Sequence, residues 1–189
     1  MVVTDDAELA ERLRLLRSHG MTSLTWDRHR GHASSYDVVA RGFNYRLDEL
    51  RAAVGLVQLR RLPEENAARA RIASRYREAL DGKNGLTMPF GRTGDERTSS
   101  NHLAVVLIPE GIDRDGVRTA LTERGIQTSV HYPPIHTFSA YSSRHGRALP
   151  RTDAIASRLL TLPMYGRLSG EQVESVIEGV LNAVVACRR

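Results

Sequence analysis

Residues 42–59 read GFNYRLDELRAAVGLVQL, a stretch that changes from a turn-like start into a strongly helical pattern. From residue 47 onward, apolar side chains recur at the spacing of one helix face: Leu47, Leu50, Val54 and Val57, widened by Ala53, Leu56 and Leu59. An apolar band this wide is expected to be buried against more than one neighbour. Helical composition continues to Leu80 across Pro63, because a proline is tolerated in the first turn of a resumed helix. The stretch therefore predicts a long helix that ends before a strong turn signal at 81–85.

The residues before this helix predict a strand end, a short helix and a long connection. The apolar start at 1–3 favours the end of a strand, and Asp5 with Glu8 forms an N-cap pair. The next apolar residues, Leu9, Leu13 and Leu16, share one helix face. The pair at 19–20, His-Gly, is typical of a helix C-terminus. Residues 21–43 are polar and aperiodic, and a connection of that length in a compact domain is usually functional or mobile.

The residues after the turn signal alternate between strand and helix patterns. An apolar run at 102–108 predicts a buried strand, and Asp113 caps a helix that ends at 124–125. A second strand is predicted at 126–132, followed by a loop to Pro150 and two more helical segments. The last helix begins with a capping-box pattern at 169–172. This order indicates a small α/β or α+β domain.

Composition excludes several classes of protein. The 189 residues are 41% hydrophobic and 26% charged, which indicates a globular chain of one domain or two small ones. No run approaches the length of a membrane span, and the N-terminus does not resemble a secretion signal, so we expect a cytoplasmic protein without a membrane partner. One cysteine, Cys187, excludes an intramolecular disulfide and any cysteine-cluster metal site.

The basic residues are 26 arginines and a single lysine, Lys83. The net charge of +5 suits a nucleic-acid partner in principle, because clustered cations neutralise phosphates. The arginines are interspersed with acidic residues along 64–78, however, which indicates solvated helix faces. We therefore expect no nucleic-acid partner.

Motifs for nucleotide phosphates, zinc proteases and serine hydrolases are missing from the sequence. His29 and His32 stand close together, but two histidines without a nearby carboxylate cluster are weak evidence for a metal. We expect no metal site.

The first candidate site is formed by Asn44 and Arg46, directly before the predicted long helix. Helix N-termini offer unpaired N–H groups and partial positive charge, so an amide and a guanidinium there suit an anion, particularly a phosphate. The alternative is that Asn44 is a capping or turn residue and Arg46 a surface charge.

The second candidate site is the segment HYPPIH at 131–136, at the end of a predicted strand. Its prolines stiffen the chain, and His131, Tyr132 and His136 could hold a polyhydroxylated substrate by hydrogen bonds. The alternative is a rigid surface loop. A third segment, Leu162–Gly166, links two predicted helices and favours packing over chemistry.

Taken together, four segments resemble the DegT/DnrJ/EryC1/StrS family of sugar aminotransferases in order and spacing. They are the stretch from Asp5 with RSHG at 17–20, GFNYRLDELRAAVG with Gln58-Leu59, HYPPIH at 131–136, and LPMY at 162–165. The resemblance covers essentially the whole chain. It implies an α/β chain that is the C-terminal part of a type I aminotransferase fold: 1–46 from the end of the large cofactor domain and active-site loop, 47–84 as an interface and linking helical segment, and 85–189 as a small C-terminal α/β domain.

The family is dependent on pyridoxal 5'-phosphate (PLP) and moves an amino group from an amino acid, usually glutamate, onto a nucleotide-linked keto sugar. Its members are homodimers with active sites at the subunit interface. The resemblance implies that Asn44 reaches the cofactor phosphate of the partner subunit, with Arg46 close by. It also implies that His131, Tyr132 and His136 line the sugar-nucleotide pocket, and that the long helix contributes to the dimer contact.

The chain departs from the family in lacking the segment with the lysine that forms the internal aldimine. Lys83 lies in the turn-like stretch at 81–85, where a lysine is solvated and not activated. We therefore expect no catalytic residue here, weak or no PLP binding, and inactivity of this chain alone. An alternative is a non-catalytic dimerisation or regulatory module that pairs with an aminotransferase chain. Without a large domain, the apolar face at 47–59 would be exposed and prone to association.

Overall fold

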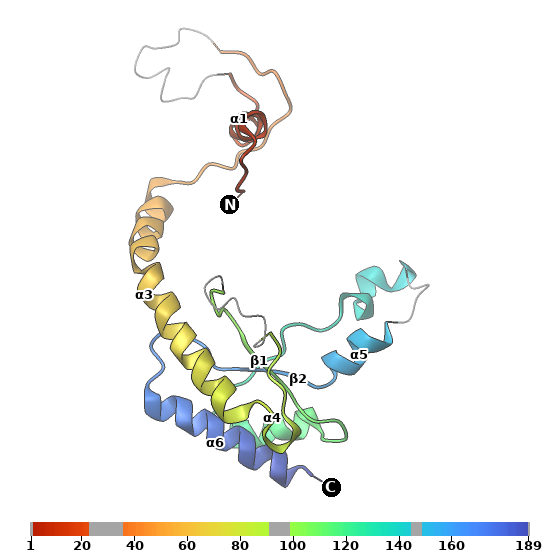
Figure 1. Cartoon of the computed structure of the whole chain (residues 1–189). Helices are drawn as coiled ribbons and strands as arrows, with labels where there is room; N and C mark the ends of the chain where they lie inside the picture. Colours follow the sequence, from red (N-terminus) through yellow and green to blue (C-terminus); the bar gives the residue numbers. More distant parts are fainter. Residues whose placement is uncertain (1, 23–35, 91–98, 145–148, 189) are drawn as a thin grey trace. The chain divides into compact units, whose positions relative to one another are not determined.

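The computed structural model describes residues 2–22, 36–90, 99–144 and 149–188 (Figure 1). The chain divides into two compact units, an N-terminal unit, Met1–Arg60, and a C-terminal unit, Arg61–Arg189. The division into 1–46, 47–84 and 85–189 stays a prediction. The helices are α1 (Ala7–Leu16), α3 (Glu49–Leu80), α4 (Arg114–Glu123), α5 (Pro150–Ala156) and α6 (Gly170–Ala186), with 3-10 turns η1 (Lys83–Gly85), η2 (Ile135–Thr137) and η3 (Ser139–Arg144) and strands β1 (Ala104–Leu107) and β2 (Leu159–Leu162).

In the N-terminal unit, helix α1 is capped by Asp6, whose Oδ1 accepts a hydrogen bond from the Leu9 amide at 3.0 Å. The expected cap, Asp5, is wrong by one residue. The expected strand end at 1–3 is also wrong: Val2 and Val3 have no strand partner within the part of the chain that is described, and both are well exposed. An apolar pair forms a strand only where another strand accepts its hydrogen bonds.

The chain reverses directly after α1, at the predicted His19–Gly20 stop. Both residues have positive φ, 64° and 74°, a backbone conformation in which glycine is favoured. The returning segment then pairs with the residues that follow α1 through isolated antiparallel bridges, Ser18 with Asn44 and Met21 with Val38. These bridges fix residues 42–46 beside residues 16–20.

The C-terminal unit is built on the antiparallel pair of β1 and β2, in which Ala104 lies opposite Leu162 and Val106 opposite Leu160. Helices α4 and α6 lie on the same side of this pair (Figure 1). The core also includes Tyr76 from the second half of α3. The other fully buried side chains of this core include Leu80, Leu86, Val106, Ile108, Val117, Leu121, Leu160, Val180 and Val184.

Several predicted elements of this unit are confirmed and one is wrong. The strand at 102–108, the helix capped by Asp113 and the capping box of Ser169 with Gln172 are all present. The expected strand at 126–132 contributes only one bridge, between Ser129 and Thr161. Residues 159–162, between the two predicted helical segments, form β2, a strand that the sequence did not predict. A short apolar run does not distinguish a buried strand from a helix, and pairing with β1 decides it.

Helix α3 runs without a break from Glu49 to Leu80, with Pro63 inside it. Its buried residues, Ile72, Ala73, Tyr76 and Leu80, all lie in its second half. The apolar band of the first half is exposed, with Leu50 at 82% and Val54 at 62%. The burial expected for this band from its width is therefore not provided by the described residues.

No helix in the described ranges has the length and apolarity that a membrane crossing requires.

The exposed band of α3 predicts self-association of the chain. We expect light scattering to give a mass above the 21.0 kDa of one chain, and the double variant Leu50→Glu/Val54→Glu to shift it toward that value, because charge in an apolar contact is unfavourable. Val185→Glu is the matched control, since Val185 is a similarly exposed valine on α6. A wild-type chain that is monomeric at high concentration would contradict this prediction.

Candidate functional site

The first candidate segment, residues 43–46, is held by backbone hydrogen bonds against the end of α1. The Phe43 amide donates to the Leu16 carbonyl at 2.7 Å, and the Tyr45 amide donates to the Arg17 carbonyl at 2.9 Å. The rings of Phe43 and Tyr45 stack, with centroids 5.1 Å apart. Between them in sequence, Asn44 is exposed. The segment is therefore a fixed platform that presents the Asn44 side chain outward.

Arg46 is anchored within the same unit. Its Nε donates to the hydroxyl of Ser18 at 3.1 Å, and Ser18 is 1% exposed. The buried hydroxyl orients the guanidinium, which keeps a positive charge two residues from Asn44.

The helix N-terminus is not the source of positive potential that the sequence suggested. Helix α3 begins at Glu49, five residues after Asn44, and the Asp48 carboxylate accepts from the Arg51 amide at 2.9 Å. A carboxylate cap satisfies a first-turn amide and opposes an anion there. An anion contact in this segment thus depends on the Asn44 carboxamide and the Arg46 guanidinium themselves.

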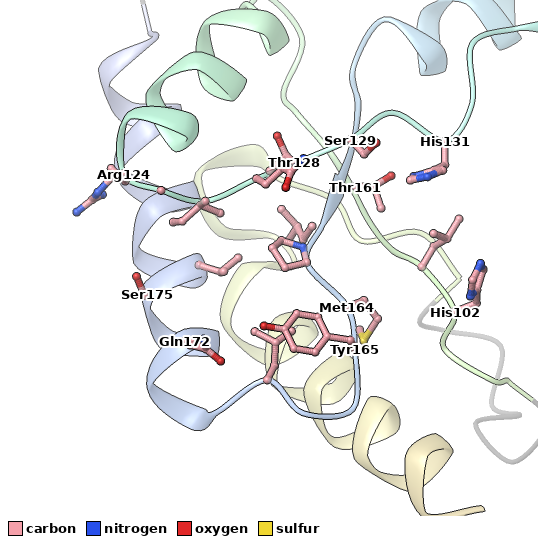
Figure 2. A pocket seen from close by; sticks show the side chains of 18 residues that line it. His102, Arg124, Thr128, Ser129, His131, Thr161, Met164, Tyr165, Gln172 and Ser175 are labelled. Carbon is pink, nitrogen blue, oxygen red and sulfur yellow. The ribbon is translucent and has the colours of Figure 1, made fainter. Parts of the chain in front are cut away.

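The second candidate region is a cavity of about 590 Å3 in the C-terminal unit (Figure 2). It lies beside Thr161 of β2, the segment that follows β2, and the first turns of α6. None of the lining residues carries a carboxylate. The polar lining residues are His102, Arg124, Gln127, Thr128, Ser129, His131, Thr161, Tyr165, Gln172 and Ser175.

The three predicted substrate residues are separated by the structure. His131 lines the cavity, and its ring meets that of Tyr132 edge to face with centroids 4.8 Å apart. Tyr132 is 69% exposed and lies outside the lining. The Nε2 of His136, in η2, lies 2.8 Å from Oδ1 of Asp153 in α5. His136 thus links η2 to α5. Both belong to the part of the chain that contains η2, η3 and α5 and extends away from the sheet (Figure 1). Their roles toward a substrate stay predictions.

The segment Leu162–Gly166, expected to serve packing, supplies one wall of the cavity. It begins at the last residue of β2 and does not follow a helix, and Pro163, Met164 and Tyr165 line the cavity. Tyr76 of α3 fixes this wall, because its hydroxyl donates to the Pro163 carbonyl at 3.0 Å. Burial raises the pKa of Tyr76 above its usual range, and Tyr165 adds to this effect.

Sequence reasoning missed Thr161, His102 and Tyr76. Thr161 had a signal, because it is a polar residue inside the apolar run LLTL. Tyr76 and His102 had none, since their relation to the cavity depends on contacts across the fold.

The remaining expectations concern lysine and metals. Lys83 is exposed in η1, next to Gly82 and Asn84, which both have positive φ, so the prediction of a solvated lysine is confirmed. Among the described residues, no three histidine, cysteine or acidic side chains gather as a metal site would require. His29 and His32 lie outside the described residues.

Comparison with known proteins gives one consistent result. The sequence profile of the DegT/DnrJ/EryC1/StrS aminotransferase family matches residues 1–181. The spore coat polysaccharide biosynthesis protein SpsC of Bacillus subtilis (strain 168) is 36% identical over 192 residues, which cover 97% of this chain and 49% of SpsC.

Two solved structures extend this result to the fold. The aminotransferase TlmJ from Streptoalloteichus hindustanus matches with a TM-score of 0.79 and 36% identity, over 96% of this chain and 46% of TlmJ. Helicobacter pylori PseC, an aminotransferase involved in the biosynthesis of pseudoaminic acid, matches with a TM-score of 0.85 and 29% identity, over 97% of this chain and 48% of PseC. The chain thus spans about half the length of these relatives.

The platform at 43–46 requires a glycine at position 42. A Cβ there would lie 2.3 Å from the Gly20 nitrogen and 2.6 Å from the Leu16 oxygen, and neither backbone atom can move freely. We expect Gly42→Ala to destabilise the N-terminal unit by about 2–3 kcal/mol and to accelerate hydrogen exchange at the Phe43 and Tyr45 amides.

Gly55→Ala is the matched control, because nothing lies within 4 Å of a Cβ at position 55. Because Gly55 lies inside the first half of α3, the substitution should stabilise the helix by about 0.5–1 kcal/mol. Unchanged exchange in Gly42→Ala would refute the close approach.

The buried Tyr76 predicts a pH dependence of stability. The pKa of Tyr76 is raised in the folded chain. The contribution of Tyr76 to the free energy of unfolding is therefore complete below about pH 10, the pKa of an unfolded tyrosine. It is lost as the pH rises above that value, because the unfolded state then releases the proton more easily. Urea denaturation at pH 8 and pH 10.5 should show this decline.

Tyr76→Phe should lower the free energy of unfolding at pH 8 by about 1–3 kcal/mol, since the Pro163 carbonyl loses its donor, and should make the decline shallower. Tyr141→Phe, at an exposed tyrosine of η3, is the control. If spectroscopic titration shows all tyrosines ionising together near pH 10, the burial argument fails.

Proposed function

This chain belongs to the DegT/DnrJ/EryC1/StrS aminotransferase family, and we propose that it supplies the C-terminal part of a PLP-dependent enzyme that aminates nucleotide-linked keto sugars. The observation that carries the proposal is the family match over residues 1–181, a range that includes all the candidate segments. The names of SpsC and PseC place these relatives in polysaccharide and pseudoaminic acid biosynthesis, which supports a sugar substrate.

The residues of this chain fit PLP as a peripheral contact and not as a complete site. When bound, PLP supplies the electron sink for amino-group transfer. The lysine that such a site needs must be desolvated and fixed, whereas Lys83 is exposed in a turn. Asn44, in contrast, is exposed on a fixed platform and suits a contact with a phosphate held by another subunit.

Each candidate residue then has a defined task. The carboxamide of Asn44 donates a hydrogen bond to a phosphate oxygen of the partner subunit's cofactor. Arg46, held by Ser18, adds positive charge beside it. His131 binds the sugar inside the cavity. Tyr132 and His136, in the adjoining segment, line the edge of the sugar-nucleotide pocket. The 189 residues are inactive by themselves, because the chain has no lysine placed for an aldimine.

A second proposal is a non-catalytic module that pairs with an aminotransferase chain. The exposed apolar half of α3 favours pairing of some kind, since Leu47, Leu50 and Leu59 are each more than half exposed. Pairing alone does not require chemistry at Asn44 or His131. The main proposal therefore predicts transferase activity in a complex that contains this chain, whereas the second proposal assigns this chain no part in catalysis.

Complementation tests the main proposal. The chain is co-expressed with the lysine-bearing N-terminal half of a related family member, and the purified complex is assayed with glutamate and a nucleotide-linked keto sugar. We expect PLP-dependent amino transfer by the complex and none by the chain alone. Asn44→Ala should reduce this activity about tenfold or more and weaken PLP retention, because a charge-assisted hydrogen bond to phosphate is lost.

Asn182→Ala, at an exposed asparagine of α6 that does not line the cavity, is the control. A complex that forms but has no activity favours the non-catalytic module. Borohydride reduction that fixes PLP onto Lys83 of the chain alone would overturn the assignment of inactivity.

A further inference from the structure

Thr161 occupies an unusual position in the sheet of the C-terminal unit. Its neighbours in β2, Leu160 and Leu162, are buried in the core, so the alternation of a strand directs Thr161 to the opposite face. There it forms a row with Val105 of β1 and with Ser129, whose backbone exchanges two hydrogen bonds with Thr161 at 2.8 and 3.1 Å. Figure 2 shows Ser129, Thr161 and His131 beside one another at one end of the cavity.

Two polar atoms at this end of the cavity are buried without a hydrogen-bond partner among the described residues. They are Oγ1 of Thr161, a residue 5% exposed, and Nδ1 of His131. A buried hydroxyl or ring nitrogen left unpaired is unfavourable, so native proteins pair nearly all such atoms. Both residues line the same cavity.

The chemistry of the cavity selects the kind of partner. A threonine hydroxyl and a neutral imidazole can each donate or accept one hydrogen bond, which suits a ligand hydroxyl. The lining has no carboxylate, and in Figure 2 the Arg124 side chain extends away from the other labelled residues. Pro163 and Met164 add an apolar wall that can cover the face of a ring. A neutral, hydroxyl-bearing ring fits these features better than an anion.

We propose that Thr161 is a substrate-binding residue, whose Oγ1 pairs together with Nδ1 of His131 with hydroxyl groups of a sugar ring in this cavity. The inference rests on the proposed function in taking the ring as the sugar of the substrate. It adds a residue, Thr161, and a ligand chemistry, neutral hydroxyls, to the predicted segment at 131–136. Tyr76 serves as a positioning residue, because it holds the Pro163 wall.

The direct test is NMR titration of the full chain, with the Thr161 methyl group and the His131 ring as reporters. The probes are UDP-glucose, methyl β-D-glucopyranoside, UDP and inorganic phosphate. We expect saturable shifts at both reporters with the two sugar probes and none with UDP or phosphate. Thr161→Val, which keeps the side-chain shape without the hydroxyl, should weaken sugar binding about three- to tenfold.

Thr122→Val is the matched control, because Thr122 is exposed on α4 and its hydroxyl already donates to the Arg118 carbonyl at 2.9 Å. It should leave the dissociation constant unchanged. The proposal is overturned if neither sugar probe produces a saturable shift, if Thr161→Val binds as tightly as the wild type, or if phosphate or UDP alone reproduces the shifts.

Thermal stability separates a ligand contact from a structural hydroxyl. Without ligand, Thr161→Val should have the same or a higher Tm, since an unpaired buried hydroxyl is removed. A clear decrease in Tm would mean that the hydroxyl has a partner in the free chain, and would overturn the inference.

The complemented enzyme separates failure of this inference from failure of the proposed function. An active complex in which Thr161→Val leaves KM for the sugar unchanged overturns the role of Thr161 alone. A complex without transferase activity whose sugar binding still depends on Thr161 overturns the proposed aminotransferase function and supports the sugar site.

Discussion

Burial of the second half of α3 in the core of the C-terminal unit is the constraint on which the candidate cavity depends. Tyr76 and Leu80 are both fully buried there, and each such side chain contributes about 1.5–3 kcal/mol through the area removed from water. Tyr76 has a second task, since its hydroxyl holds the Pro163 carbonyl. The packing of one helix therefore fixes the chain that follows β2, and with it one wall of the cavity.

Charged contacts around this core add orientation more than stability. Arg75 of α3 binds Glu174 of α6 through two hydrogen bonds of 2.6 and 2.7 Å. The pair raises the pKa of Arg75 and lowers the pKa of Glu174, chiefly through the side-chain hydrogen bond. Because both side chains are 46% exposed, solvent screens most of the attraction. The contact aligns α3 with α6, whereas apolar burial supplies the free energy.

The first half of α3 carries a wide apolar band but has no cover among the described residues. Leu50 is 82% exposed although Leu80, in the same helix, is fully buried. The solved relatives are about twice as long as this chain, so the difference agrees with a helix whose first half contacts other parts of a larger assembly. The platform at 43–46 lies directly before this exposed half.

The sequence by itself determined the family, the long helix, the strand at 102–108 and the helix caps at Asp113 and Ser169, because these depend on local patterns and on motifs in register. It also located His131 and showed that the lone lysine lies in a turn. Only the tertiary structure decided that residues 159–162 form a strand, because a run of three leucines and one threonine fits a helix or a strand until a partner strand binds it. The same pairing brought Thr161 and His131 to one cavity, whereas Tyr132 and His136 were directed elsewhere. Spacing along the chain could not separate these residues, since the direction of each side chain is set by contacts between distant segments.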